Sequence, residues 1–292
     1  MSSATGATVP ATATRLRSSM TNDDELSPRH ARPRDRVNTK VVLLSAGPGD
    51  LELLTLKAAR ALAAAEVLLL DDLVAPGIAE LAPRARIVRV GKRGGCRSTP
   101  QAFICRLMRR YATQGIRVVR VKGGDALLFG RAGEEIAFLR QAGIEVEIVN
   151  GVSAGFAAAA ALGMSLTHRD HCHGVTFVTA HTHDHGEPDW AALAATGTTL
   201  VIYMGMTRIQ SLTRALLRHL PPDTPAAIVQ SASLPDEVRL FATLDQLSEQ
   251  SDKAWPDRPG VILVGRAVAQ AREEVACGPC AGREDLRERL QR

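Results

Sequence analysis

The chain has 292 residues, of which 45% are apolar and 3% aromatic, and its formal net charge is +5 at pH 7. This length and apolar fraction suffice for one large or two ordinary domains with a buried core. The apolar runs are too short to cross a bilayer, and the aromatic residues are too few for the stacking platforms of most single-strand nucleic-acid binders. Neither a membrane nor a nucleic acid is therefore expected as a partner, and an acidic small molecule explains the positive charge equally well.

Both ends of the chain differ in composition from the middle. Residues 1–38 are rich in Ser, Thr, Ala, Pro and Arg without apolar periodicity, which predicts a disordered extension; a transit peptide is the alternative interpretation. Residues 272–292 are predicted to form a tail. Cys277 and Cys280 in this tail have the spacing of a redox dithiol, but no βαβ context surrounds them. The odd number of cysteines, without a signal peptide, favours reduced thiols and a cytoplasmic protein.

Residues 39–153 alternate between strand-length apolar runs and segments long enough for helices, which predicts an N-terminal α/β domain with a mostly parallel sheet covered on both faces. Thr55 is the expected N-cap of the first helix, and the run EEIAFLRQAG is expected to end at its glycine. The expected strands are Val41–Leu44, Val67–Leu70, Ile87–Val90, Val118–Val121 and Val146–Val149.

Residues 154–271 repeat this alternation and predict a C-terminal α/β domain, joined to the first near residues 150–153. We expect mostly parallel or mixed sheets in the two domains and a cleft between them, where ligands commonly bind. The expected elements are a helix at Gly155–Leu162, strands at Val175–Thr179, Thr199–Met204, Ala226–Gln230 and Val261–Val264, and helices between the strands.

The turn GPGD, residues 47–50, follows the first strand, where many α/β proteins hold a phosphate. Pro48 has no N–H to donate, no Lys-Ser/Thr pair follows, and Asp50 places a negative charge at the position of the anion. The glycines still permit a ligand to approach the backbone closely. The turn therefore indicates a ligand that is not a phosphate.

A denser motif, VVRVKGGDALLFGRAGEE, spans residues 118–135. Its GGD follows a strand, at the carboxyl end where crevices form in open parallel sheets. An arginine and two acids then open the next helix, where a purely structural loop needs neither. The helix dipole stabilises a negative charge in the first turn of a helix, which explains one of the two acids, Glu134 or Glu135, without a functional role.

The motifs GPGDLELLTLKAARAL, LDDLV, VGKRGG, VKGGDALLFGRAGEE, LTHRD and LVIYMGM resemble, in order and spacing, those of the tetrapyrrole methylase family. The resemblance covers residues 41 to 268. It implies S-adenosyl-L-methionine as methyl donor, a cation without phosphate, and a homodimer without a metal. The combination of VGKRGG, FGRAGEE and LTHR implies methylation of uroporphyrinogen III at C2 and C7 to precorrin-2, on the way to sirohaem or cobalamin.

The resemblance also assigns roles to individual residues. The catalytic positions that it implies are Asp71, Lys92, Arg131 and Glu134, with Asp71 and Lys92 as proton carriers. Cofactor contacts are implied for Pro48, Gly123, Gly124, Asp125, Leu128, Ser153, Ala154, Met204 and Ala232. Substrate contacts are implied for Arg131, Glu134, Arg169 and Met204, because arginines can fork onto the carboxylates of the macrocycle.

The chain departs from the family pattern in its loops. Ser45 replaces the usual glycine before AGPGD, and Ala126-Leu127 stands where the family usually has Pro-Phe. Asn150 replaces a usual proline, and Gly155 stands where alanine or another small residue is more common. These departures affect loop rigidity and cofactor affinity more than the reaction.

Two other functions stay open at this stage. A related methylase of a later precorrin or of ribosomal RNA has a similar motif set. The histidines between His168 and His185, which include an HxH spacing, fit a metal-handling protein. A fused dehydrogenase and chelatase is not expected, because 38 residues before the first strand are too few for an NAD-binding domain.

Overall fold

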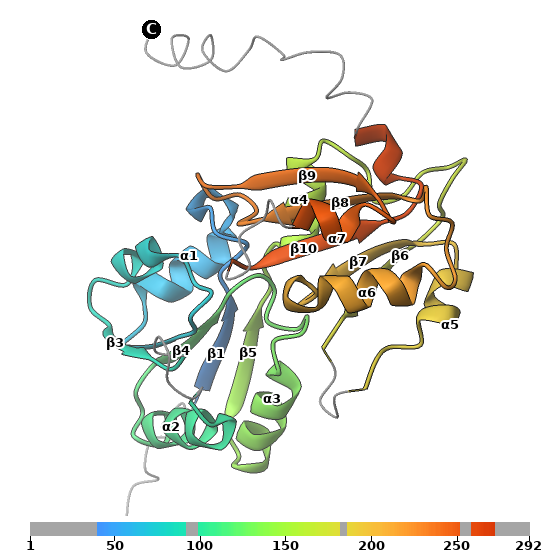
Figure 1. The fold of residues 1–292 in the computed structure, drawn as a ribbon. Coiled ribbons are helices and arrows are strands. Elements are labelled where there is room, and N and C mark those ends of the chain that lie inside the picture. The colour runs from blue at the N-terminus through green and yellow to red at the C-terminus, as the bar shows by residue number, and fades with distance from the viewer. Residues whose placement is uncertain (1–39, 92–98, 182–185, 252–257, 272–292) are drawn as a thin grey trace, which may run out of the picture. The chain divides into compact units, whose positions relative to one another are not determined.

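The structure is a computed structural model that describes residues 40–91, 99–181, 186–251 and 258–271 (Figure 1). The first set of elements alternates strands and helices, as the sequence predicted. It comprises β1 (Lys40–Ser45), α1 (Leu56–Ala63), β2 (Val67–Leu70), β3 (Arg86–Arg89), α2 (Gln101–Thr113), β4 (Val118–Lys122), α3 (Ala132–Gln141) and β5 (Glu145–Val149), with short 3-10 helices at Leu51–Leu53 and Pro76–Leu81.

The first sheet has five parallel strands in the order β3-β2-β4-β1-β5, with β4 in the centre. Val41 of β1 lies opposite Val118 of β4 and Val146 of β5. Because successive side chains of a strand point to opposite faces, this register places alternate residues of all strands on the same face. The carboxyl ends of β1, β2 and β4 therefore share one edge of the sheet.

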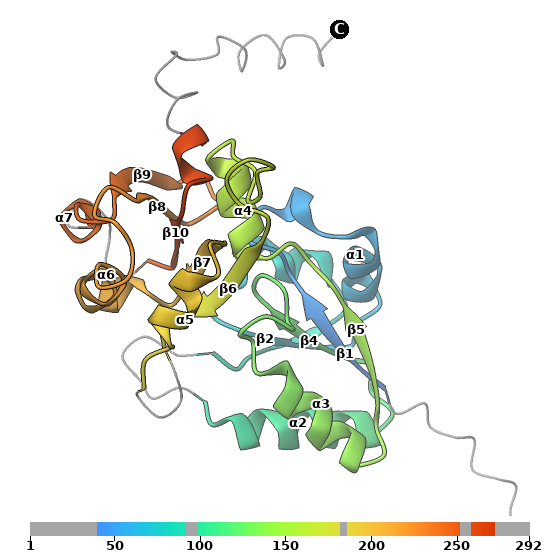
Figure 2. The ribbon, with the colours of Figure 1, turned by 90° about the vertical axis from the view of Figure 1, so that its right-hand side faces the viewer.

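Helices cover both faces of the first sheet. On one face Val41, Leu69 and Val118 pack with buried residues of α2 and α3, which lie side by side in Figure 2. On the other face the intervening strand residues pack against α1 and the 3-10 segment before β3. Thr55 caps α1 as predicted, since its hydroxyl accepts a hydrogen bond from the Ala58 N–H at 3.1 Å. Helix α3 ends at Gln141, and Gly143 takes the left-handed conformation after it, with φ of 71°.

The second set of elements forms a mixed sheet in the order β6-β7-β10-β8-β9, in which only β6 and β7 are parallel. Helices α5, α6 and α7 pack on one face and α4 on the other. The elements are α4 (Ala154–Ala161), β6 (Val175–Thr179), α5 (Trp190–Ala195), β7 (Thr199–Tyr203), a 3-10 helix (Met206–Arg208), α6 (Ile209–Leu216), β8 (Pro225–Gln230), β9 (Val238–Thr243), α7 (Leu247–Ser251) and β10 (Gly260–Val264). The predicted fold class, α/β with parallel and mixed sheets, is confirmed.

Two elements differ from the sequence prediction. Strand β9 was not predicted; it pairs with β8 as an antiparallel neighbour, so no helix separates these two strands. The segment between β2 and β3 is a 3-10 helix instead of an α-helix, and Pro76 opens it. Proline is tolerated at the first position of an α-helix, so of these two residues only Gly77, which has low helix propensity, disfavours an α-helix here.

Several predictions fall outside the described residues. These are the disordered extension at 1–38, the tail at 272–292 with Cys277 and Cys280, and the proton carrier Lys92. The domain boundary near residues 150–153 remains a prediction; this segment connects β5 to α4. Among the residues that the structure describes, none of the helices is long and apolar enough to span a membrane.

Candidate functional site

Two loops meet at the carboxyl edge of the first sheet. The GPGD turn follows β1 and the GGD loop follows β4, and backbone bonds join them: Gly47 N–H donates to Gly124 O at 3.1 Å, and Gly124 N–H donates to Gly47 O at 2.7 Å. The predicted cofactor residues Pro48, Gly123 and Gly124 are thereby brought into one backbone-lined region. The N–H groups of Gly47, Asp50 and Gly124 are already bonded to groups of the chain, and Pro48 has none, so these four cannot cradle a phosphate in this arrangement.

Steric limits explain why this region uses glycine. A Cβ atom added at Gly123 would lie 2.5 Å from the carbonyl oxygen of Leu73, which is backbone and cannot move aside cheaply. Gly124 has a φ of 64°, in the left-handed region that side chains disfavour. Gly123 therefore requires glycine for the loops to meet as they do, and the conformation of Gly124 favours it.

Asp125 ties the GGD loop to the segment after β5. Its carboxylate accepts hydrogen bonds from the Leu127 N–H at 2.8 Å and from the Gly151 N–H at 3.1 Å. The Leu128 N–H donates to the Asp125 carbonyl at 3.1 Å, which closes the turn that carries Leu128. The structure thus uses the side chain of Asp125 to fix the loops, a role that does not depend on a ligand.

Ser45 and Ala126, two of the departures from the family pattern, form a hydrogen bond with each other. The Ala126 N–H donates to the Ser45 hydroxyl at 2.9 Å, and both residues are buried. The usual family residues, glycine and proline, have no hydroxyl to accept and no N–H to donate at these positions. The two departures therefore compensate each other.

The segment before α4 is fixed by a tyrosine of the second sheet. The Tyr203 hydroxyl lies 2.7 Å from the Ser153 hydroxyl and accepts the Gly155 N–H at 2.7 Å. Burial raises the pKa of Tyr203, so its hydroxyl stays protonated near neutral pH. Ser153 and Ala154, two predicted cofactor residues, are held at the start of α4 by this tyrosine, which the sequence analysis did not single out.

The loops after β7 and β8 carry the remaining predicted cofactor residues. Met204 follows β7 and is 47% exposed, whereas Ala232 follows β8 and is buried. The Ser233 hydroxyl, next to Ala232, accepts a hydrogen bond from the Asp50 N–H at 3.1 Å. This contact connects the GPGD turn of the first sheet with the loop after β8.

Left-handed backbone conformations gather around these loops. Among the described residues, the non-glycine positions with positive φ are Phe129, Arg131, Met204, Ser231 and Ser233. Each of them is a predicted site residue or is adjacent to one. Such conformations cost free energy and concentrate at functional sites. The strained positions therefore lie in the same loops as the predicted site residues, whose roles remain predictions.

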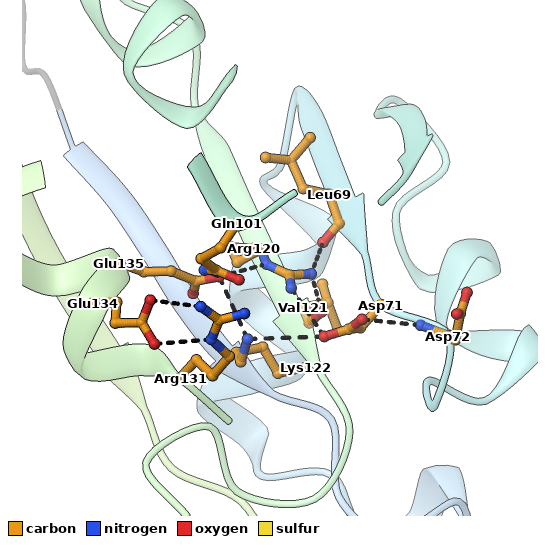
Figure 3. A network of polar contacts seen from close by, with 10 residues as sticks. All are labelled: Leu69, Asp71, Asp72, Gln101, Arg120, Val121, Lys122, Arg131, Glu134 and Glu135. Carbon is orange, nitrogen blue, oxygen red and sulfur yellow. Dashed lines mark hydrogen bonds and ion pairs between the residues drawn. The ribbon is translucent and has the colours of Figure 1, made fainter. Parts of the chain in front are cut away.

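A cluster of charged side chains lies at the same edge of the first sheet (Figure 3). Asp71, directly after β2, has a side chain that is 35% exposed, and its Oδ2 accepts a hydrogen bond from Arg120 Nη2 at 2.9 Å. Lys122 Nζ lies 3.8 Å from the same oxygen. On the inner side, Glu135 Oε1 accepts from Arg120 Nε at 3.3 Å and from Lys122 Nζ at 3.4 Å. Asp71 is thus the half-exposed end of a buried ionic network.

Burial changes the protonation equilibrium of Lys122. Desolvation lowers its pKa, and the charge of Arg120 lowers it further, whereas Glu135 and Asp71 act in the opposite direction. The carboxylates of Asp71 and Glu135 face the cations of Arg120 and Lys122, and of these four side chains only that of Asp71 is more than 5% exposed. Such a group is tolerated only because each charge has an opposite neighbour.

Arg131 and Glu134 form an exposed pair at the start of α3. Arg131 Nε and Nη2 donate to Glu134 Oε1 and Oε2, both at 2.8 Å, and the two side chains are 57% and 56% exposed. These hydrogen bonds raise the pKa of Arg131, whose guanidinium carries a positive charge at any physiological pH. The pair is therefore available at the surface, in contrast to Glu135, which is fully buried in the network.

Arg169 and the histidines between His168 and His185 are the remaining predicted residues. Arg169 is exposed in the turn that follows Leu166, where the His168 N–H donates to the Cys172 carbonyl. The rings of His168 and His171 stack with centroids 4.6 Å apart. Within the described residues no group of three or more His, Cys, Asp or Glu side chains could hold a metal ion, and His183 and His185 lie outside that range.

The sequence analysis missed Arg120, Lys122, Gln101 and the buried role of Glu135. One signal was present: arginine and lysine alternate with valine in the strand VVRVK, although a central parallel strand is normally apolar on both faces. Charges at alternate positions of such a strand share one face and need partners there. This pattern indicated a buried ionic network next to the GGD loop.

Comparison with known proteins places the chain among methyltransferases. The profile of the Tetrapyrrole (Corrin/Porphyrin) Methylases matches residues 40–248. A uroporphyrinogen-III C-methyltransferase of Pseudomonas aeruginosa is 52% identical over 227 residues, which cover 77% of this chain and 93% of that protein.

Solved structures with the same fold include two methyltransferases. The uroporphyrin-III C-methyltransferase of Thermus thermophilus, complexed with S-adenyl homocysteine, is 39% identical with a TM-score of 0.69, over 79% of this chain and 99% of that one. A cobalt-precorrin-4 methyltransferase is 28% identical with a TM-score of 0.72, over 79% and 96%. The backbone is thus equally similar to both structures, and the sequence is closer to the first.

Proposed function

The chain belongs to the tetrapyrrole (corrin/porphyrin) methylases, and we propose that it transfers methyl groups from S-adenosyl-L-methionine to C2 and C7 of uroporphyrinogen III, giving precorrin-2. The observation that carries the proposal is that hydrogen bonds link the loops that hold the proposed cofactor residues: the GPGD turn, the GGD loop, the segment before α4 and the loop after β8. The proposed substrate is supported by 52% identity with a uroporphyrinogen-III enzyme and, among the solved structures, by 39% identity with such an enzyme against 28% with a cobalt-precorrin-4 enzyme.

The residues present fit this methyl donor. The proposed cofactor contacts are Pro48, Gly123, Gly124, Asp125, Leu128, Ser153, Ala154, Met204 and Ala232. Many of them would act through backbone atoms, and a Cβ atom added at Gly124 would have only the Ala154 nitrogen within 4 Å, at 3.8 Å, so there is space beside the backbone of this loop. When bound, the cofactor supplies a methyl group on a cationic sulfur, which has no need of a phosphate cradle.

The chain's own groups would orient the macrocycle and receive a proton. Attack by a pyrrole carbon on the methyl group depends first on alignment of the reactants, and the methylated ring then loses a proton. We assign proton transfer to Asp71, whose carboxylate is partly exposed and directed by Arg120. Lys92 is the second proposed proton carrier. Arg131 and Glu134, exposed as a pair, would lie against the reacting ring.

Substrate binding is assigned to Arg131, Glu134, Arg169 and Met204. Arginine is suited to a macrocycle with many carboxylates because its planar guanidinium donates two parallel hydrogen bonds to one carboxylate. Arg131 is exposed, but its Nε and Nη2 are bonded to Glu134, so a substrate carboxylate would replace Glu134 or bond the remaining nitrogen, Nη1. We further propose a homodimer that works in the cytoplasm; the buried free thiols of Cys105 and Cys172 are in keeping with a reducing compartment.

The test is an anaerobic assay of the purified chain with S-adenosylmethionine and uroporphyrinogen III generated in place, with the oxidised product read by mass spectrometry. We expect the macrocycle to gain two methyl groups. Cofactor binding is measured separately by calorimetry. Cofactor binding without any methylation of this macrocycle would contradict the substrate and leave the cofactor assignment standing.

Paired arginine variants of α3 test the site. Arg131→Ala removes the exposed cation proposed for the substrate, and we expect kcat/KM to fall by about 100-fold or more. Arg140→Ala, on the same helix and also exposed, is the matched control and is expected to retain activity within about 2-fold. Equal losses in both variants would show that Arg131 has no specific role.

A further inference from the structure

Arg120 is a cation placed where strands are normally apolar. Its side chain is 2% exposed, on the central strand β4 and on the face covered by α2 and α3. An ionised group at such a position costs several kcal/mol unless partners compensate for its lost hydration. A well-packed apolar residue there would avoid this cost. The position of Arg120 therefore needs an explanation beyond stability.

The contacts of Arg120 extend in two directions (Figure 3). Outward, Nη2 donates to Asp71 Oδ2 at 2.9 Å. Inward, Nε donates to Glu135 Oε1 at 3.3 Å, and Nη1 donates to the carbonyl oxygens of Leu69 and Val121 at 3.3 and 3.2 Å. The guanidinium plane is thus fixed by three acceptors on its inner side, and only its outer nitrogen reaches toward the half-exposed carboxylate.

Glu135 supplies the inner restraint. It is fully buried, and its Oε1 receives three donors, from Arg120, Lys122 and Gln101, the last at 2.9 Å. Its Oε2 has no hydrogen-bond partner within the described part of the chain. A buried carboxylate with one unsatisfied oxygen costs stability. Its negative charge compensates the positive charges of Arg120 and Lys122.

We propose that Arg120 is a positioning residue for Asp71 in the methyl-transfer reaction, and that Glu135 is the buried counter-ion that fixes the direction of its guanidinium. This inference rests on the role proposed for Asp71. The Arg120 contact holds Oδ2 on the buried side, while Oδ1 accepts the Asp72 N–H at 3.2 Å. The carboxylate is thereby restricted to one orientation at the sheet edge, which a general base requires.

Arginine is needed here because of its shape. A lysine in place of Arg120 would keep the charge but present a single nitrogen, which cannot bond Glu135 on one side and Asp71 on the other in a fixed plane. For Arg120→Lys we therefore expect kcat to fall by about 10- to 100-fold, as for other small misplacements of a catalytic group. KM and cofactor affinity are expected to change less than about 3-fold, since Arg120 does not line the proposed binding loops.

A double-mutant comparison separates positioning from a merely structural role. If Arg120 acts through Asp71, then Arg120→Lys lowers kcat in the parent chain but has no further effect in Asp71→Asn, because the group that it orients is absent. Independent losses that multiply in the double variant would overturn the proposal. Arg140→Lys, an exposed arginine of α3, is the control for the substitution itself.

A milder variant covers the case in which Arg120→Lys does not fold. Gln101→Leu removes one donor to Glu135 from a partly exposed position at the start of α2. We expect kcat to fall by about 3- to 10-fold in the parent chain and not at all in Asp71→Asn. An equal loss in both backgrounds would count against the network as a positioning device.

A crystal structure of Arg120→Lys gives a readout that does not depend on activity. We expect the Asp71 side chain to leave the rotamer seen here while the backbone of β2 and β4 stays in place. An unchanged Asp71 would refute the positioning role, whatever the substrate. If the parent chain binds the cofactor without methylating uroporphyrinogen III, the proposed function fails, and this structure still decides whether Arg120 directs Asp71.

Discussion

The central strands of the two sheets, β4 and β10, occupy the same place in the strand order and differ in what they bury. Strand β10, with the sequence GVILV, is apolar throughout its buried length, whereas β4, with the sequence VVRVK, buries two cations. The difference shows that only the first sheet directs buried charge toward its carboxyl edge. The second sheet contributes the Tyr203 hydroxyl and the loops after β7 and β8.

The largest effect is expected in the charged strand. Glu135→Gln leaves Arg120 and Lys122 without their buried counter-ion, and we expect the free energy of unfolding to fall by about 3–5 kcal/mol. Urea denaturation monitored by circular dichroism measures this loss. The neighbouring, exposed Glu134→Gln is the control and is expected to cost less than about 1 kcal/mol. A similar small loss in both variants would contradict the compensating role of Glu135.

A smaller effect is expected where the second sheet meets the start of α4. A Cβ atom at Gly155 would lie 2.6 Å from the Tyr203 hydroxyl and 2.7 Å from Val201 Cγ1, so Gly155→Ala is expected to destabilise the chain by about 1–3 kcal/mol through overpacking. Thermal unfolding and cofactor titration measure stability and affinity together. Gly133→Ala, where nothing lies within 4 Å of the added atom, is the matched control. An unaffected Gly155→Ala would mean that the neighbouring side chains move aside.

The apolar counterpart of β4 is tested by Ile262→Val. Ile262 is fully buried in the middle of β10, and loss of one methylene is expected to cost about 0.5–1.5 kcal/mol. Because β10 carries no charge to the site, kcat is expected to be unchanged. A fall in kcat without further loss of stability would show that the second sheet takes a direct part in the chemistry.

The smallest effect is expected for charges at the exposed edge of the first sheet. Glu147 on β5 lies 2.6 Å from Lys40 Nζ and 2.8 Å from Lys57 Nζ, and the hydrogen bond to Lys40 is the main cause that lowers its pKa below the ordinary value of 4.5. A lowered carboxyl pKa stabilises the fold above the unfolded-state pKa, and this contribution is lost as pH falls through the folded-state pKa.

Glu147→Gln is therefore expected to reduce stability at pH 7 by less than about 1 kcal/mol. The difference from the parent chain should shrink below about pH 4.5, where the carboxyl group of the unfolded chain is protonated. Urea denaturation at a series of pH values and at high salt checks this. A difference that grows on acidification would show that the pair acts in the opposite sense.

Local patterns were sufficient to predict most of the fold. The strands of the first sheet lie within one residue of their predicted ends, because each is a short apolar run bounded by a polar segment. Strand β9 escaped prediction because its VRLFAT sequence mixes polar and apolar residues, and antiparallel pairing with β8 stabilises it. The loops of the candidate site were predicted from their motifs; the structure shows hydrogen bonds between these loops, and the roles of their residues stay predictions.

The ionic network could not be derived from the sequence in the same way. Arg120 meets Glu135 at 15 residues' separation and Asp71 at 49, and neither spacing follows from helix or strand periodicity. Only the register of β2 beside β4 and the packing of α3 on the sheet bring these groups together. The charges in VVRVK signalled that partners must exist but not which residues they are.

The hydrogen bond between Ser45 and Ala126 bears on how loops can be exchanged with relatives. These two positions lie 81 residues apart in sequence, yet an acceptor at one requires a donor at the other. A graft that brings only the relatives' glycine to position 45 would leave the buried Ala126 N–H without an acceptor. A graft that brings only proline to position 126 would leave the Ser45 hydroxyl without its donor. Chimeric enzymes built on this chain must therefore carry the β1 turn and the GGD loop as one exchangeable unit.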